Sequence, residues 1–586
     1  MRQWMVAAKK ADFYAIAEKF HVDPVVARII RNREVIGEKN IRIYLGGNLS
    51  DLSDPHQMKD MDRLVEILAQ KIRKQVHIRI IGDYDVDGVT SSHLFLTALR
   101  RVGAKVDVVI PHRIQDGYGL SLHLLQQAKE DGVDTILTCD NGIAAIDEIA
   151  WAKAQKMTVL VTDHHAVPFE EHEGRRTEKK SLADAVVNPH QQDCGYPYKE
   201  LCGAGVAWNV IRVLYENYDM DKREAEDLLD FVAMATVCDV MSLTGENRIL
   251  VKEGLKRIRH TKNIGLQALM QACNVQPENI SAYHFGYVLG PCVNATGRLD
   301  TARHALRLFE TGQETEAEEI ARDLVDLNQE RKELTLQGVE MAKKLCEEGG
   351  YENDPVLVLF LPDVHESIAG LIAGRIREMY NRPVFVLTRG EEGVKGSGRS
   401  TENYSMYENM CGCAELFTKF GGHPMAAGLS LPEENVEKFR RKINENCPLT
   451  VEEVCPDIHI DMAMPVGYAS TELVHQFALL EPFGKDNPSP LFADRNLSIS
   501  RMWLIGKNRN VLRMSVLSEY GQPVPVIFFG DVETLFAYFT EKFGQEEVEN
   551  ALHGRKNRIL FSMVYTAKVD FYQGNENLQL EMKYYR

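Results

Sequence analysis

The stretch IRIIGDYDVDG at residues 78–88 is a run of apolar and β-branched residues that stops at an aspartate. The same pattern returns as TILTCDNG at 135–142 and as TVLVTDHH at 158–165. A continuous apolar run that ends in a turn is typical of a strand buried on both faces of a parallel sheet. The three stretches therefore predict parallel strands, each followed by acidic or histidine side chains.

The polar residues after these strands predict one site. In an open α/β sheet, ligands bind outside the carboxyl ends of the strands, so these side chains would converge on one rim. They are Asp83, Asp85, Asp87, Asp140, Asp163, His164 and His165. A helix N-cap or a turn explains any single aspartate more simply. It does not explain three such clusters with two adjacent histidines.

The chemistry of the cluster favours two divalent cations. Mg²⁺ and Mn²⁺ prefer carboxylate oxygens, and an imidazole such as that of His164 shifts the preference toward Mn²⁺. Asp140 could bridge two ions, and a pair of ions about 4 Å apart orients a water and holds a phosphate oxygen during phosphodiester hydrolysis. A calcium loop in DYDVDG is the rival, but Leu94 stands where that loop requires a glutamate.

The composition is that of a globular chain. Its 586 residues suggest about four domains. The net charge of −17 gives no basic footprint of a nucleic-acid binder, although a local groove can be positive on an acidic protein. The 11 cysteines lack paired zinc spacing, and the lone C-x-C of Cys411 and Cys413 is a weak metal candidate. Without a signal peptide or an apolar run of about 18 residues, we expect a cytoplasmic protein with no membrane segment.

Alternating patterns predict two α/β units joined by a long helix. Strands are expected at 77–82, 105–110, 134–139, 157–162 and 184–187, with helices at 88–102, 121–131 and 143–155. Residues 315–348 form one helical pattern, and strands at 355–360 and 383–388 flank a helix at 366–380. The β-rich runs at 497–504, 511–517, 524–529, 558–570 and 577–585 suggest a small β-barrel, for which an oligonucleotide-binding (OB) fold is one candidate.

Several motifs occur in order along the chain. They are DYDVDG at 83–88, TCDNGI at 138–143, DHH at 163–165, ATVCDVMSLTGENR at 235–248, GPCVNATGRL at 290–299, GSGRS at 396–400, FGGHPMAAG at 420–428 and LEPFGKDNPSPLF at 480–492. Together they resemble the motifs of the DHH phosphoesterase superfamily, and specifically those of its RecJ family of single-strand-specific 5′→3′ exonucleases. The last motif separates this family from smaller relatives.

The resemblance implies a multidomain α/β chain of five parts. They are an N-terminal helical cap at 1–50, a parallel-sheet DHH phosphoesterase domain at 51–314, a connecting helix at 315–349, an α/β DHH-associated domain at 350–450 and an OB-type barrel at 451–586. The barrel would feed single strands to the site by charge and stacking, with Arg501, Trp503, Lys507 and Arg509 as candidates, although Trp503 is equally suited to core packing.

The resemblance also implies roles for the site residues. Two Mn²⁺ or Mg²⁺ ions would be held by Asp85, Asp87, Asp140, His164 and Asp239. Asp83 and Asp163 would support the site, and His165 would stabilise charge on the scissile phosphate. The residues implied to bind phosphate are Asn294, Arg298, Ser397, Gly398, Arg399 and His423. Backbone N–H groups of the GSGRS segment would contribute to this binding. For GSGRS a tight turn, and for His423 a core position, are the plainer alternatives.

The chain departs from the family pattern in the second α/β unit. Val364, His365, Glu366 and Ser367 stand where the family usually has Trp-His and a glycine three beyond the tryptophan, so the role of that tryptophan is in question. None of the departures touches an implied metal ligand.

The function implied is removal of 5′ mononucleotides from single-stranded DNA by two-metal hydrolysis, in DNA repair and recombination. A hydrolase of short oligonucleotides or cyclic dinucleotides is the alternative, and a scaffold that has lost activity is a third possibility. A single-strand-binding protein and a helicase are the implied partners, and we expect a monomer.

Overall fold

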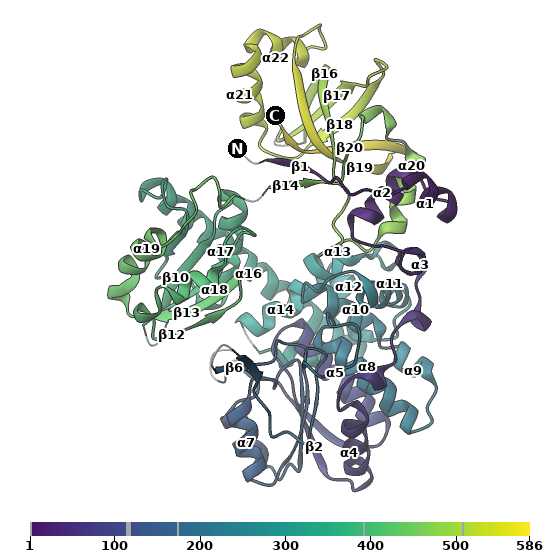
Figure 1. Cartoon of the computed structure of the whole chain (residues 1–586), viewed down its shortest axis with the longest axis vertical. Helices are drawn as coiled ribbons and strands as arrows, with labels where there is room; N and C mark the ends of the chain where they lie inside the picture. Colours follow the sequence, from purple (N-terminus) through teal and green to yellow (C-terminus); the bar gives the residue numbers. More distant parts are fainter. Residues whose placement is uncertain are drawn as a thin grey trace. The chain divides into compact units, whose positions relative to one another are not determined.

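The computed structural model describes residues 3–112, 116, 119–172, 175–299, 301–390, 393–455, 457–506, 509–572 and 574–586. Its contacts divide the chain into two units. Figure 1 labels helices and strands of both along the sequence colours. The first unit comprises Leu52–Ser242 and Glu246–Pro456, and the second comprises Gln3–Asp51, Leu243–Gly245 and Asp457–Arg586. The finer division into five parts stays a prediction.

The first unit begins with the expected parallel sheet. Its strand order is β3-β2-β4-β5-β8, and all neighbours are parallel. The strands are β2 (His77–Ile81), β3 (Lys105–Val109), β4 (Thr135–Cys139), β5 (Thr158–Thr162) and β8 (Ala185–Val187). The helices beside them are α4 (Met61–Arg73), α5 (Val86–Arg101), α6 (Leu122–Glu130), α7 (Ile146–Ala154) and α8 (Gly203–Asn217). The buried strands confirm the prediction from the three apolar runs, and the hairpin of β6 (Phe169–His172) and β7 (Arg175–Glu178) was not predicted.

A mainly helical region follows in the same unit. It contains α9 (Lys222–Glu226), α10 (Leu229–Cys238), α11 (Gly245–Ile258), α12 (Ile264–Ala272), α13 (Ala282–His284), a π-helical turn (Phe285–Leu289), α14 (Gly290–Leu299), α15 (Arg303–Glu310) and α16 (Glu314–Glu348). Helix α16 has 35 residues and confirms the single long helix that the sequence predicts. Within the described part of the chain, no helix has the length and apolar character that crossing a membrane requires.

The second α/β part of this unit has a mixed sheet of order β12-β13-β11-β10-β9. Its strands are β9 (Leu357–Phe360), β10 (Val384–Gly390), β11 (Gly393–Arg399), β12 (Lys419–Gly422) and β13 (Ala426–Leu431), and its helices are α17 (Glu366–Tyr380), α18 (Met406–Cys411) and α19 (Val436–Glu445). Val364 packs into the core between α16 and α17, and His365 caps α17 by accepting the N–H of Ser367. The departure from the family pattern therefore has a structural role here.

The second unit joins both ends of the chain. Strand β1 (Trp4–Val6) pairs in parallel with β14 (Ile458–Ile460). The remaining elements are α1 (Phe13–Phe20), α2 (Pro24–Asn32), α3 (Glu38–Gly46), β15 (Met462–Ala463), α20 (Thr471–Gln476), β16 (Phe492–Ile505), β17 (Val511–Leu517), β18 (Pro523–Phe528), α21 (Val532–Phe543), α22 (Gln545–Leu552), β19 (Leu560–Tyr572) and β20 (Asn575–Tyr585). Their sheet runs β15-β16-β17-β18-β20-β19, and β19 pairs again with β16. The five β-rich runs are confirmed, whereas α21 and α22 were not predicted.

The N-terminal helices share a hydrophobic core with these strands. Apolar residues of α2 such as Val26 and Ile30 are fully buried in the same cluster as Phe492 and Met514. Their spacing of four puts the two α2 side chains on one face of the helix. Residues of α2 and of these strands thus belong to one hydrophobic cluster.

Candidate metal centre

The loop after β2 is folded so that its three aspartates lie close together. Asp85 is the N-cap of α5, and its Oδ1 accepts the N–H of Gly88 at 3.1 Å. A Cβ on Gly88 would lie 2.5 Å from the backbone N and O of Asp83, so only glycine fits this turn. Asp85 therefore caps α5 and is also a candidate metal ligand, so the N-cap interpretation does not exclude the metal site.

Asp87 is held by the start of helix α8. Its two carboxylate oxygens accept the N–H groups of Gly203 at 2.6 Å and Ala204 at 2.7 Å, and the side chain is 1% exposed. The N-terminus of a helix stabilises negative charge, which offsets the cost of burying this carboxylate. A Cβ on Gly203 would lie 2.7 Å from Cβ of Asp140, so the close approach requires glycine.

His164 connects the remaining acids. Its Nε2 lies 3.1 Å from Oδ1 of Asp140, and it lies 3.6 Å from carboxylate oxygens of both Asp87 and Asp239. Asp140 follows β4 with a left-handed backbone at φ 61°, and Asp239 is the C-cap of α10. Residues from four separate segments thus meet here: Asp87, Asp140 and His164, which were predicted at the rim from the strand ends, and Asp239, which the resemblance implied.

The ligand atoms form three overlapping groups. Within each group they lie within 4.8 Å of one another. The groups are Asp83, Asp85 and Asp140; Asp87, His164 and Asp239; and Asp140, His164 and His165. Asp140 and His164 each belong to two of the groups, and of these two only the carboxylate of Asp140 has two oxygens that could serve two ions.

The electrostatics of the rim fit a cation. Burial raises the pKa of Asp140 well above its ordinary value, and the carboxylates of Asp87 and Asp85 raise it further. Burial and the charge of Asp87 likewise raise the pKa of Asp85, while burial lowers the pKa of His164. Several buried acids cannot all be charged at this spacing without positive charge between them. This oxygen-rich donor set, with the imidazole of His164 among its carboxylates, suits Mn²⁺ or Mg²⁺.

Asp163 is occupied by protein hydrogen bonds. One of its oxygens accepts the N–H of Ile143 at 2.9 Å, and the other accepts the N–H groups of His164 and His165 at 2.7 and 3.1 Å. Although burial opposes it, the hydrogen bond with His165 and the charge of the histidines hold the pKa of Asp163 below its ordinary value. This geometry agrees with a supporting role for Asp163.

His165 lies at the open side of the rim. Its side chain is 41% exposed, and its Nδ1 lies 2.8 Å from Oδ1 of Asp163. Burial lowers the pKa of His165, but the hydrogen bond with Asp163 and that residue's negative charge outweigh it and raise the pKa to about 9. The Asp163 carboxylate therefore favours the protonated form of His165.

Helix α14 contacts the metal loop, which is formed by residues 83–87 after β2. Oδ1 of Asn294 accepts the N–H of Val86 at 3.1 Å, and a Cβ on Gly297 would lie 2.4 Å from the carbonyl oxygen of Tyr84. Arg298 reaches the second α/β part, where its Nη1 donates to the carbonyl of Ser367 at 2.7 Å. Asn294 thus lies beside the loop that carries Asp85 and Asp87, and Arg298 directly follows Gly297, which packs on the same loop.

The GSGRS segment differs from the prediction. It forms most of β11, which pairs with β10 on one side and β13 on the other, so its backbone groups belong to the sheet and form neither a turn nor a phosphate cradle. Gly398 faces the core, because a Cβ there would lie 2.5 Å from Sδ of Met406. Ser397 and Arg399 are on the opposite face of the strand.

That face of β11 lines a cavity of about 530 Å³. Its lining includes Ser397 and Lys395 of β11, Ser367 of α17 and Tyr84 of the metal loop. His423 is exposed in the turn between β12 and β13, so it is not a core histidine. The substrate-binding roles of Ser397, Gly398, Arg399 and His423 stay predictions.

Three contributors to the site were missed in the sequence. Asn141 is buried and donates to the carbonyls of Ile81 and Cys139, which ties the ends of β2 and β4 together. Asn188, directly after β8, donates to the carbonyl of His165 at 2.9 Å. A polar residue at a fourth strand end was a signal for Asn188, and the helix-opening glycine in CGAG was a signal for Gly203.

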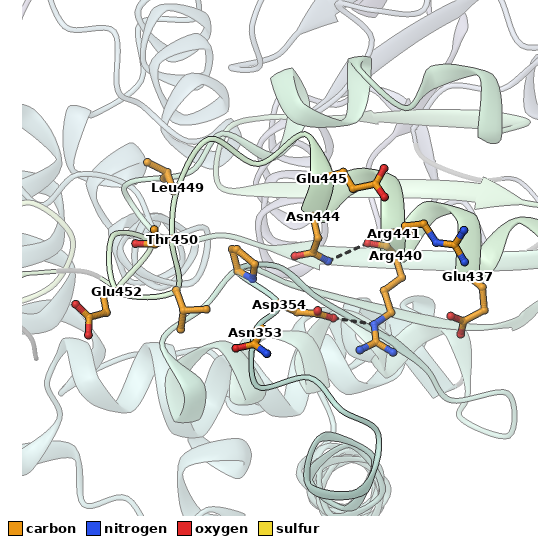
Figure 2. A pocket seen from close by; sticks show the side chains of 12 residues that line it. Asn353, Asp354, Glu437, Arg440, Arg441, Asn444, Glu445, Leu449, Thr450 and Glu452 are labelled. Atoms are coloured by element: carbon orange, nitrogen blue, oxygen red, sulfur yellow. Dashed lines mark hydrogen bonds and ion pairs between the residues drawn. The ribbon is translucent and has the colours of Figure 1, made fainter.

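A larger cavity lies elsewhere in the second α/β part. It measures about 920 Å³ and is lined by charged residues of α19 and by the loop before β9 (Figure 2). Its charges are partly paired, since Nε of Arg440 donates to Asp354 at 2.7 Å. None of the predicted site residues lines it, and the candidate metal groups among the described residues lie at the rim instead.

Three regions match known domain families. Residues 77–236 match the DHH family, N-terminal domain; residues 353–447 match the DHHA1 domain; and residues 460–584 match the RecJ OB domain. With the acidic rim, these matches define a DHH-type protein that carries both additional domains. Similar proteins called single-stranded-DNA-specific exonuclease RecJ occur in Haemophilus influenzae, at 32% identity over 96% of each chain, and in Escherichia coli, at 31% over 95% of each chain. The chain belongs to the RecJ family.

Other relatives differ in length. The RecJ exonuclease of Bacillus subtilis is 33% identical over 87% of this chain, and the match spans 63% of that relative's length. A crystal structure of RecJ with Mn²⁺ from Thermus thermophilus has a TM-score of 0.81 at 25% identity, covering 100% of this chain and 79% of that one. A second structure, of an exonuclease RecJ bound to manganese, has a TM-score of 0.57 at 32% identity over 66% of this chain and 94% of that one.

Proposed function

We propose that this protein is a metal-dependent exonuclease that removes mononucleotides from the 5′ end of single-stranded DNA. The observation that carries the proposal is the rim where Asp140 and His164 lie 3.1 Å apart among further acids of two other segments. Similarity to exonucleases across nearly the whole chain, including the RecJ OB domain, supports the choice of substrate.

The rim would hold two divalent cations, Mn²⁺ or Mg²⁺. The ligands would be Asp85, Asp87, Asp140, His164 and Asp239, with Asp140 between the ions. When bound, the ions would polarise a phosphate oxygen and lower the pKa of water. Asp87 is aligned for this by the amides of Gly203 and Ala204, so its carboxylate needs little reorganisation.

Other side chains would act on the phosphate directly. The Asp163 carboxylate favours the protonated form of His165 and fixes its orientation, so His165 would stabilise negative charge that develops on the phosphate. The guanidinium of Arg298 suits phosphate oxygens because it offers several parallel N–H donors. Asn294 would keep the metal loop in register through its bond to Val86.

The second unit offers a surface for single strands. Trp503 of β16 is partly exposed and lies near two guanidinium groups, with Arg501 at 5.6 Å and Arg513 at 6.0 Å from its ring. Bases stack on aromatic rings while cations attract the backbone, so this trio favours nucleic-acid binding over core packing. Arg509 is exposed in the turn before β17, and Lys507 lies outside the described residues.

The test uses single-stranded DNA labelled at the 5′ or the 3′ end, and a blunt duplex. We expect prompt release of the labelled 5′ mononucleotide with Mn²⁺, none with EDTA or with Asp140→Ala, and normal release with Asp147→Ala, which changes an exposed acid. Release that begins at the 3′ end, or equal digestion of the duplex, would contradict the polarity and specificity. If long strands survive while short oligonucleotides or cyclic dinucleotides are hydrolysed, the alternative function is correct.

The cellular setting follows from the family resemblance alone. It comprises a monomer in the cytoplasm that acts in DNA repair and recombination with a single-strand-binding protein and a helicase. Light scattering would contradict the monomer by showing a dimer mass. Affinity purification of the tagged chain from its own cells would contradict the partners by recovering neither protein.

A further inference from the structure

Two free cysteines of the first unit lie in contact near α14. Sγ of Cys273 is 3.7 Å from Sγ of Cys292. Cys273 follows the last residue of α12, and Cys292 is in the first turn of α14. Neither thiol belongs to the candidate metal groups.

The two thiols have different surroundings. Cys273 is partly exposed, whereas Cys292 is buried and its sulfur accepts the Nδ2–H of Asn328 at 3.3 Å. The hydrogen bond with Cys292 lowers the pKa of Cys273, and the positive charge of Lys332 adds to this against the effect of burial. The same bond with Cys273, together with burial, raises the pKa of Cys292. The accessible sulfur is thus the better nucleophile, and the buried one stays a thiol beside it.

We propose that Cys273 and Cys292 form a reversible disulfide when the protein meets a peroxide. The Cys273 thiolate attacks one peroxide oxygen, the O–O bond breaks, and a sulfenic acid and a hydroxide form. Cys292 then attacks the Cys273 sulfur, the S–S bond forms, the S–O bond breaks, and water leaves. In total the two thiols lose two electrons and two protons, and the peroxide is reduced to two waters because the hydroxide takes the proton that Cys273 lost. An added dithiol then reduces the disulfide to two thiols and is itself oxidised to a disulfide.

The bond would move α14. A disulfide has an S–S distance of about 2.05 Å, so the two sulfurs must approach by roughly 1.7 Å from their present separation. Two residues after Cys292, Asn294 holds the N–H of Val86, and Gly297 packs on the carbonyl of Tyr84. A displaced α14 therefore strains the loop between Asp83 and Asp87, and we expect slower hydrolysis. This consequence rests on the proposed function, whereas the thiol chemistry does not.

The first experiment detects the proposed disulfide by mass spectrometry. The reduced full chain is treated with hydrogen peroxide, alkylated, digested and analysed by mass spectrometry. We expect a linked pair of peptides that contain Cys273 and Cys292, lost after treatment with dithiothreitol. Cys273→Ser should abolish the linked pair, while Cys411→Ser, which changes an exposed thiol, should leave it. If both thiols stay open to alkylation, or if either links to another cysteine, the proposal is wrong.

The second experiment measures the hydrolysis rate on labelled single-stranded DNA. Because displacements of about 1 Å at a catalytic site can cost 100-fold, we expect oxidation to slow the protein about tenfold or more. Dithiothreitol should restore the rate, and Cys273→Ser should keep its rate in peroxide. Complete cross-linking with an unchanged rate would refute the effect on α14. A reduced protein that cleaves no DNA would refute the proposed function and leave the mass result standing.

Discussion

Asp140→Asn separates stability from metal binding. The substitution keeps the size of the side chain and removes a negative charge from a buried cluster of acids. Burial and the neighbouring carboxylates already raise the pKa of Asp140 well above its ordinary value, which means that the charged form is disfavoured when no cation is present. Without metal, the variant should therefore be at least as stable as the unchanged protein.

With metal, the order should reverse. An ion at 100 times its dissociation constant stabilises the folded state by about 2.7 kcal/mol, so two ions supply about 5 kcal/mol. In a unit of roughly 400 residues, with an unfolding entropy of about 2.1 cal/mol/K per residue, this raises the melting temperature by about 6 °C. The variant would lack the charge shared by both ions, so we expect its Mn²⁺ shift to stay below about 2 °C.

The assay is thermal unfolding at pH 8 in EDTA and in a series of Mn²⁺ concentrations, followed by calorimetry or circular dichroism. Asp147→Asn is the matched control, because Asp147 is an exposed acid and should keep the full Mn²⁺ shift. A variant that melts well below the unchanged protein in EDTA would refute the electrostatic reasoning. A variant that keeps the full Mn²⁺ shift would refute the placement of Asp140 between two ions.

Three further substitutions test other parts of the structure. Gly203→Ala places a methyl group 2.7 Å from Cβ of Asp140, so exonuclease rate should fall by about 100-fold while circular dichroism stays unchanged; a normal rate would contradict this close packing. Arg33→Ala removes the cation that pairs with the buried Asp461 at 2.7 Å, so it should lower the free energy of unfolding of the second unit by about 3–5 kcal/mol in denaturant. A loss below about 1 kcal/mol would contradict the buried pair. Burial lowers the pKa of His93 to about 3, so the stability it confers is complete above its ordinary pKa of 6.5 and declines as pH falls toward 3, by about 1.4 kcal/mol per pH unit. His93→Leu should flatten that decline in unfolding measured from pH 7 to 4, and an unchanged slope would show that His93 titrates normally.

Much of the rim could be predicted from the sequence because its signals are local. An apolar run that ends in an aspartate marks both a buried strand and the position of its end, and parallel strands bring such ends to one edge. Asp83, Asp140 and Asp163 follow β2, β4 and β5 for this reason. The long helix α16 could also be predicted, because one periodic pattern covers it without an interruption by proline.

The GSGRS segment shows where local reasoning fails. Glycine and serine favour turns, yet this segment is a strand inside a sheet. Glycine is required at Gly398 because Met406 and Phe385 approach too closely for a side chain. That crowding comes from residues at other places in the chain, so composition alone left a phosphate-binding loop and a tight turn as the interpretations and did not indicate a strand.

The amino-acid sequence by itself determined the strands, the long helix and the identity of the acids at the rim, because hydrophobic periodicity and turn chemistry act over a few residues. Tertiary structure decided the contacts between distant segments. Asp87 meets the amides of Gly203 and Ala204, the N-terminal helices share a core with the C-terminal strands, and Cys273 meets Cys292. Such contacts depend on how whole elements bury their apolar faces against one another, and no short stretch of sequence encodes that choice.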